Sequence, residues 1–137
     1  MSAKFTKWFP SGFRLINGLA LTNWFNNPQS STEDAITATA GGTQAAGYAL
    51  SAIISRVSVC VTNGDSVKLP PASKVVGGAY VVINDGAANL AVYPNEAAGT
   101  IDGGAAAASV TVTAGRRAIF WLPAGTAWVS GGLTKAS

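Results

Sequence analysis

Six acidic side chains give this sequence its main capacity for chemistry, because the chain contains no histidine. The acids are Glu33, Asp34, Asp65, Asp85, Glu96 and Asp102. Without histidine there is no usual general base, no Ser-His or Cys-His nucleophile pair and no imidazole ligand for zinc. Two carboxylates could in principle serve a glycosidase, but most of these acids stand beside Gly or Asn, in turn contexts where Asp accepts local backbone hydrogen bonds. The sequence therefore predicts no enzymatic activity and no catalytic residues.

Residues 81–104, VVINDGAANLAVYPNEAAGTIDGG, hold the densest group of acids, amides and glycines. An EF-hand loop needs oxygen ligands at alternate positions and a closing Glu, and the order that begins at Asn84 does not supply them. Neither GxGxxG nor GxxxxGK[ST] stands ahead of a helix, so the stretch is not a phosphate loop either. A looser calcium site between Asp85, Glu96 and Asp102 remains an alternative. We predict no metal and no cofactor, and we expect the stretch to turn the chain.

Composition favours a single domain that packs against other protein. The chain has 137 residues, of which 48% are hydrophobic and only 11% are charged. This length is enough for one core without metal or disulfide support, and the low charge suits a surface covered by other subunits. A small neutral β domain is the alternative interpretation.

Apolar stretches and cysteine content favour an intracellular origin without membrane contact. Gly, Asn, Thr and Pro interrupt every apolar stretch, so we expect no signal peptide and no membrane-spanning segment. The single cysteine, Cys60, cannot form an internal disulfide, and we interpret it as a small filler side chain. These features predict synthesis in a reducing cytoplasm.

Short strand patterns separated by turns fill the chain after residue 34. Strands of about five residues, with turn signals every ~8 to 12 residues, are typical of an antiparallel β-sandwich or small barrel. We therefore predict an all-β domain over residues 34–137, with a hairpin turn at Asp85 and Gly86 or just beyond, and another turn at residues 102–104. The strands are expected at residues 35–39, 53–62, 66–70, 78–84, 90–94, 109–113, 117–123 and 127–131.

Two of these strands, YVVI and AIFWL, are apolar on both faces. A two-layer domain can bury only one face of each strand, so the second face must lie under the leading segment or against another copy of the chain. Large side chains of these and neighbouring strands are predicted to be core or subunit-interface anchors, and stacking of the aromatic ones on sugars is the alternative. The predicted oligomer-interface residues are Tyr80, Val82, Tyr93, Phe120, Trp121 and Trp128.

Residues 1–33 differ from the rest and are predicted to form an N-terminal arm. Residues 13–25, FRLINGLALTNWF, have the only helical periodicity, and NNP ends it, so we expect a short helix or helical turn. Lys4, Lys7 and Arg14 make the arm basic, with no acid before Glu33. Three charges are few for nucleic acid, since a strong binder neutralises roughly 6 to 10 phosphates. We expect no direct contact with nucleic acid, and a solvated terminus is the alternative.

The order of the motifs resembles a family of small structural proteins of tailed bacteriophages and prophages. The similar elements are GFRLINGLALTNWF, then LPPA before a strand, NDGAANLAVYP, TIDGG, a short strand, TAGRRAIF and a late Trp. They run from Gly12 to about Val129, and the most specific are VVINDGAANLAVYP and the TIDG that follows it. The basic, aromatic opening MSAKFTKWFPS departs from this pattern.

The resemblance implies a virion structural protein without catalytic residues, often trimeric. We expect a capsid decoration or cement protein on the outer head surface, made in the host cytoplasm, which bridges subunits of the major capsid protein as a homotrimer. A tail, fibre or baseplate protein, which could contact host glycan, is the alternative. The arm residues expected to bind the capsid are Lys4, Lys7, Trp8, Phe9, Arg14, Trp24 and Phe25.

Overall fold

The computed structural model describes residues 31–74 and 77–133. The first strand begins at Thr32, two residues before the predicted start of the β domain. The predicted arm helix lies outside the described residues. The elements are β1 (Thr32–Thr37), β2 (Tyr48–Ala49), β3 (Ile54–Val59), β4 (Ser66–Lys68), the 3-10 turn η3 (Ala72–Lys74), β5 (Ala79–Asn84), β6 (Leu90–Tyr93), β7 (Thr100–Ile101), β8 (Val110–Val112), β9 (Arg116–Ala124) and β10 (Ala127–Leu133).

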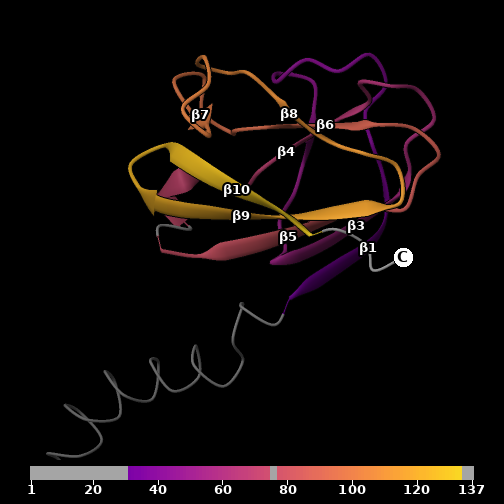
Figure 1. The fold of residues 1–137 in the computed structure, drawn as a ribbon, viewed down its shortest axis with the longest axis horizontal. Helices are drawn as coiled ribbons and strands as arrows, with labels where there is room; N and C mark the ends of the chain where they lie inside the picture. Colours follow the sequence, from indigo (N-terminus) through magenta and orange to yellow (C-terminus); the bar gives the residue numbers. More distant parts are fainter. Residues whose placement is uncertain (1–30, 75–76, 134–137) are drawn as a thin grey trace, which may run out of the picture. The chain divides into compact units, whose positions relative to one another are not determined.

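The strands form two sheets, and the all-β, sandwich-like prediction is confirmed. A six-stranded sheet has the order β1-β3-β5-β9-β10-β7, and a four-stranded sheet has the order β2-β4-β6-β8. Figure 1 shows β4, β6 and β8 above β5, β9 and β10, as two layers. The sheets remain separate, and the fold resembles a β-solenoid more than the barrel that was the other predicted form.

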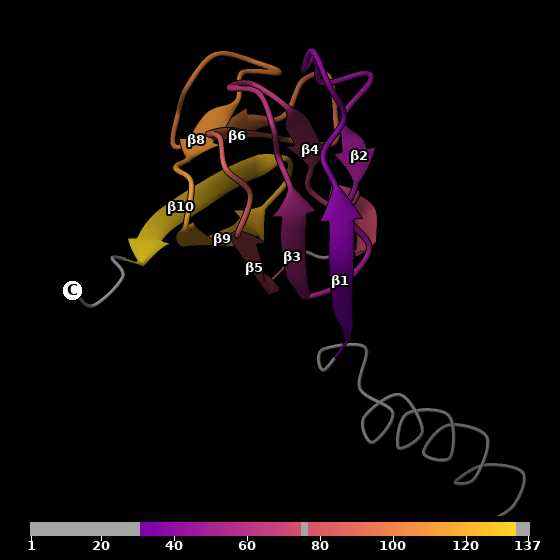
Figure 2. The same cartoon turned by 90° about the vertical axis from the view of Figure 1, so that its right-hand side faces the viewer.

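Three successive coils build the first part of both sheets. Each coil places one strand in each sheet: β1 then β2, β3 then β4, and β5 then β6. Figure 2 shows β1, β3 and β5 side by side and running in one direction. Because each strand is followed by a corner into the other sheet, the next strand to reach the same sheet arrives parallel. The predicted antiparallel pairing is therefore wrong for the four pairings between coils, and β7 also pairs parallel with β10, so five of the eight pairings are parallel.

The chain reverses after the third coil. Strand β8 pairs antiparallel with β6, β9 pairs antiparallel with β5, and β10 pairs antiparallel with β9. The eight expected strands are all present, whereas β2 and β7 were not predicted. Each of these two has only two residues, which is too short to show the two-residue period of a strand.

One hydrophobic core lies between the two sheets. Alternate side chains of the six-stranded sheet point into it and meet alternate side chains of the four-stranded sheet. Trp128 packs edge-on against Tyr80, with ring centroids 5.9 Å apart. The most completely buried apolar members are Val57, Val67, Leu69, Val82, Leu90, Val92, Phe120, Leu122 and Trp128.

The predicted hairpin at Asp85 and Gly86 is wrong, because this segment is a corner between the sheets. Strand β5 ends at Asn84 in the six-stranded sheet, and β6 begins at Leu90 in the four-stranded sheet. Gly86 is not among the residues with positive φ, so it does not serve a tight hairpin turn. A Cβ on Gly86 would lie 2.5 Å from Cβ and 2.6 Å from the backbone nitrogen of Cys60. This glycine therefore allows the third coil to contact the backbone of the second.

The buried side chain of Asn84 holds the same corner in shape. Its Oδ1 accepts a hydrogen bond from the Gly86 N–H at 3.0 Å. Its Nδ2 donates to the carbonyl oxygens of Ala88 and Val112, both at 2.8 Å. One side chain thus joins β5, the corner and β8.

The turn predicted at residues 102–104 is present. Asp102 and Gly103 both have positive φ, 54° and 71°, and the Gly104 N–H donates to the Ile101 carbonyl at 2.9 Å. These are the features of a type I′ turn, in which Asp-Gly is a favoured pair.

A further acid shapes the corner between β3 and β4. Asp65 accepts hydrogen bonds from the N–H groups of Val61 and Thr62, both at 2.9 Å. These backbone donors, that of Thr62 foremost, lower the pKa of Asp65 below its usual 3.8. Cys60 is buried in the same corner, where desolvation raises the pKa of its thiol.

Acid should weaken this corner through Asp65. A carboxyl whose pKa is lowered on folding adds stability above its ordinary pKa, and this stability is lost as the pH falls through the folded-state pKa. We expect the thermal midpoint of the wild type to fall more steeply below pH 3.8 than that of Asp65→Asn, which cannot lose a charge there. Thermal melts followed by circular dichroism from neutral to acidic pH measure both slopes, and parallel slopes would contradict the assignment.

Candidate interaction surface

The outer face of the six-stranded sheet carries a continuous group of apolar side chains. On β3, β5, β9 and β10, the residues between the buried ones point away from the core. We call this group the outer apolar patch: Ile54, Val81, Ile83, Ile119, Trp121 and Val129. Ile54 is 38% exposed, Trp121 41% and Val129 46%, while the other three are half-buried.

Strand register brings these side chains together. Ile54 is aligned with Val81, and Val81 with Ile119. Trp121 is aligned with Val129 on β10. A Cβ on Gly131 would lie 2.9 Å from Cζ3 of Trp121, so the indole ring lies over this glycine. The patch therefore crosses four neighbouring strands without a charged residue inside it.

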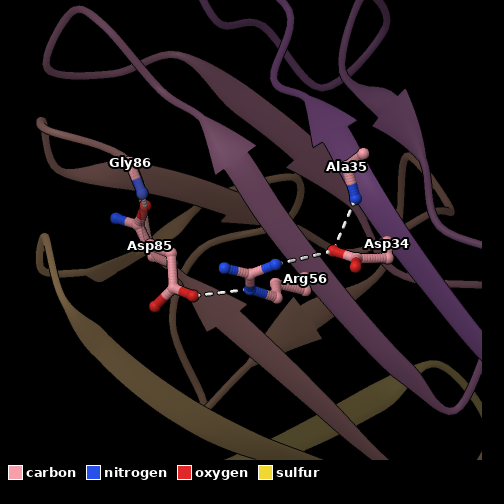
Figure 3. Close-up of polar contacts among 6 residues, drawn as sticks. Asp34, Ala35, Arg56, Asp85 and Gly86 are labelled. Carbon is pink, nitrogen blue, oxygen red and sulfur yellow. Dashed lines mark hydrogen bonds and ion pairs between the residues drawn. The ribbon is translucent and has the colours of Figure 1, made fainter.

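An ion-pair network borders one end of the patch. Arg56 lies between two acids (Figure 3): its Nε is 2.6 Å from Oδ2 of Asp85, and its Nη1 is 3.1 Å from Oδ1 of Asp34. The hydrogen bonds to Asp85 and then Asp34 raise the pKa of Arg56. The Ala35 N–H and then Arg56 lower the pKa of Asp34. All three side chains are well exposed, so we expect these pairs to orient the groups more than to stabilise the fold.

A bulge in β1 places Asp34 in this network. Glu33 is aligned with Ser55 and Ile36 with Val57, so Asp34 and Ala35 together oppose the single residue Arg56. Ala35 has a φ of 57°, which is uncommon without glycine, and its N–H donates to Asp34 Oδ1 at 2.7 Å. Such a bulge disturbs the edge of a sheet and hinders the addition of a further strand there.

Arg117 borders the same end of the patch, across Ile83 from Arg56. Arg117 is aligned with Ile83 on β5. Asp85 follows Ile83 by two residues. Both ion pairs found among residues 31–74 and 77–133 use Arg56, and Arg117 takes part in neither. This end of the patch therefore has an acidic corner, where two carboxylates share one arginine, and a basic residue, Arg117, on the other side of Ile83.

Four of the six predicted oligomer-interface residues lie in the core. Tyr80 is 9% exposed, Trp128 1%, and Val82 and Phe120 are completely buried. These four are therefore not available on the surface of the domain, because the residues that alternate with them along each strand are the ones that point outward. Tyr93 is half-buried and donates from its hydroxyl to the Gly42 carbonyl at 2.9 Å. Trp121 alone belongs to the exposed outer face.

The residues expected to bind the capsid lie outside the described residues. They are Lys4, Lys7, Trp8, Phe9, Arg14, Trp24 and Phe25. Their contacts stay a prediction.

The three acids of the alternative calcium site have separate partners. Asp85 binds Arg56, Glu96 accepts the Ala72 N–H at 2.6 Å, and Asp102 accepts the Ser130 N–H at 2.7 Å. In the part of the chain that the structure describes, no group of three or more His, Cys, Asp and Glu residues is placed to hold a metal ion.

No protein-family model matches the chain, and no curated protein or solved structure is significantly similar to it. Within residues 31–74 and 77–133, no helix is both long and apolar enough to cross a membrane.

Sequence reasoning missed part of the outer apolar patch. It recognised that β5 and β9 are apolar on both faces, but of the patch residues it selected Trp121 and not Ile54, Val81, Ile83, Ile119 or Val129. A local signal exists for Ile54 alone, in the arginine within β3. Arg56 must face solvent, so Ile54, two positions earlier on the same strand, faces solvent as well, whereas the consecutive Arg116 and Arg117 leave the facing of β9 open.

Proposed function

We propose that this chain is a structural protein of a phage virion, namely a decoration or cement protein of the outer capsid surface. The observation that carries the proposal is the outer apolar patch. Contiguous exposed apolar surface on a small domain marks a site of contact with other protein. The ordered motifs of residues 12–129, which resemble those of phage structural proteins, supply the class of assembly.

In this proposal the β domain assembles with other copies, as a homotrimer, and the arm binds the major capsid protein. Trp8, Phe9, Trp24 and Phe25 supply apolar anchors, and Lys4, Lys7 and Arg14 meet acidic capsid surface. The protein reinforces the shell by adding buried area across capsomer boundaries, which opposes the outward pressure of packaged DNA. It performs no chemistry and needs no cofactor.

Deletion of residues 1–28 tests whether the arm binds the capsid while the β domain folds without it. The deletion removes no described residue, so we expect the remaining chain to keep its β structure by circular dichroism. Its occupancy on purified capsids that lack the protein should fall to background, because the capsid anchors are gone. Cosedimentation with capsids measures the occupancy, and the full chain is the matched control. Equal occupancy of the truncated and full chains would remove the arm from the proposal.

Imaging of virions tests the placement. Density spread over the shell, in hundreds of copies, is the expected result for a decoration protein. Density confined to the tail or baseplate would favour the tail alternative, in which exposed Trp121 is a group that could contact a host glycan.

A further inference from the structure

One end of the outer apolar patch carries opposite charges on the two sides of Ile83. The corner formed by Asp34, Arg56 and Asp85 has a formal charge of −1, whereas Arg117 contributes +1. Ile83 lies between the two sides, aligned with Arg56 on β3 and with Arg117 on β9. A face of this kind is complementary to itself when a neighbouring face is rotated against it.

The described residues also have little net charge to oppose self-association. Residues 31–74 and 77–133 contain five basic and six acidic side chains, a formal net charge of −1. A face designed for a strongly charged partner has a border of one sign. This border has both signs, and its centre is apolar, as in the surface of contact between subunits.

From these observations we propose that the outer apolar patch binds the same patch of a second copy of this chain. In the contact, Arg117 of one copy faces the acidic corner of its neighbour, while Trp121 and Val129 are covered. The pairing works around a two-fold axis that runs along the strands, and equally around a three-fold axis in that direction, because the opposite charges flank Ile83 across the strands. This proposal deepens the proposed function by naming the surface through which copies assemble.

Substitution at Val129 tests the apolar centre. Val129 is 46% exposed, so lysine can replace it without entering the core. The matched control is Val61→Lys, since Val61 is 73% exposed in the corner between β3 and β4, outside the patch. In the full chain we expect Val129→Lys to weaken self-association roughly tenfold or more, because a buried lysine loses its hydration. Val61→Lys should leave association unchanged.

Charge reversal tests the border. Arg117→Glu and Asp85→Lys should each weaken association, because each brings like charges together across the contact. The double variant Arg117→Glu/Asp85→Lys restores opposite charges in every contact and should recover most of the lost affinity. Lys74→Glu, on η3 and outside the patch, makes the same charge change as Arg117→Glu and should have little effect.

Sedimentation velocity of the full chain at several concentrations measures these affinities, and circular dichroism checks that each variant is folded. A dimer or trimer with the expected responses supports the proposal. The proposal is overturned if the wild type stays monomeric, or if Val129→Lys and both charge reversals leave the affinity of self-association unchanged. If the wild type is monomeric and Val129→Lys abolishes capsid binding, the patch contacts capsid instead. If copies associate as expected but do not bind capsids, the proposed function fails and this inference stands.

Discussion

Alanine in place of Gly86 should destabilise the β domain by about 3 kcal/mol or more, at the upper end of the cost of overpacking. The added methyl would lie 2.5 to 2.9 Å from Cβ, N and Cα of Cys60, and two of these are backbone atoms that cannot rotate away. The third coil must therefore move off the second. For a domain of about 100 residues we expect the thermal midpoint to fall by roughly 12 °C or more.

Gly132→Ala is the matched control for this prediction. Gly132 is exposed in β10, and a Cβ there would have no atom within 4 Å. We expect this variant to stay within about 0.5 kcal/mol of the wild type. If Gly86→Ala in a urea titration were as stable as Gly132→Ala, the corner at Gly86 would not be in the contact with Cys60 that the structure shows.

Removal of the Asn84 side chain should have a comparable effect for a different reason. Asn84→Ala leaves the Gly86 N–H and the carbonyls of Ala88 and Val112 without their partner in a buried site. Each such loss costs about 1 to 3 kcal/mol, and some water entry will reduce the sum, so we expect about 3 kcal/mol or more. Equilibrium unfolding in urea gives this free energy directly.

Asn84→Asp changes the hydrogen bonding of the side chain at position 84 while keeping its size. The carboxylate can still accept from Gly86, but it faces two carbonyl oxygens to which asparagine donates. Burial beside these oxygens raises the folded-state pKa of the new acid above its ordinary value of about 3.9. Relative to the wild type, the variant is therefore most stable below that ordinary pKa and loses stability as the pH rises through the folded-state pKa.

Asn63→Asp is the control for the pH effect. Asn63 is exposed and its Oδ1 accepts from the Asn89 N–H at 2.9 Å, a role that aspartate can also fill. We expect its stability to follow the wild type across the pH range. A stability of Asn84→Asp that did not decline with rising pH would show that water or movement of the corner relieves the charge.

The sequence predicted the strands well, because most of them have a local signal. Val110 and Val112 turn inward while Ser109, Thr111 and Thr113 are exposed, which is the alternation expected for a half-buried strand. The type I′ turn at Asp102 and Gly103 was predictable for the same reason, since its requirement for positive φ is met by residues within the turn.

The pairing of the strands, and which face of each strand points inward, were harder to predict from the sequence, because both depend on contacts between distant residues. NDG at Asn84, Asp85 and Gly86 has the composition of a hairpin turn, yet its glycine is needed for contact with Cys60 of the preceding coil. Strands β5 and β9 are apolar on both faces, so their pattern alone could not decide whether Phe120 or Trp121 points inward. A shift of one residue exchanges the two faces, and the tertiary fold makes that choice.

The reversal of the chain after the third coil has a consequence for biosynthesis. Strand β9 lies between β5 and β10, and it supplies the completely buried Phe120 and Leu122 to the core. During synthesis from the N-terminus, β5 is therefore an open strand edge until residues 116–124 emerge from the ribosome. Nascent or truncated chains that stop before Arg116 expose that edge and an unfilled core, which makes them prone to aggregate.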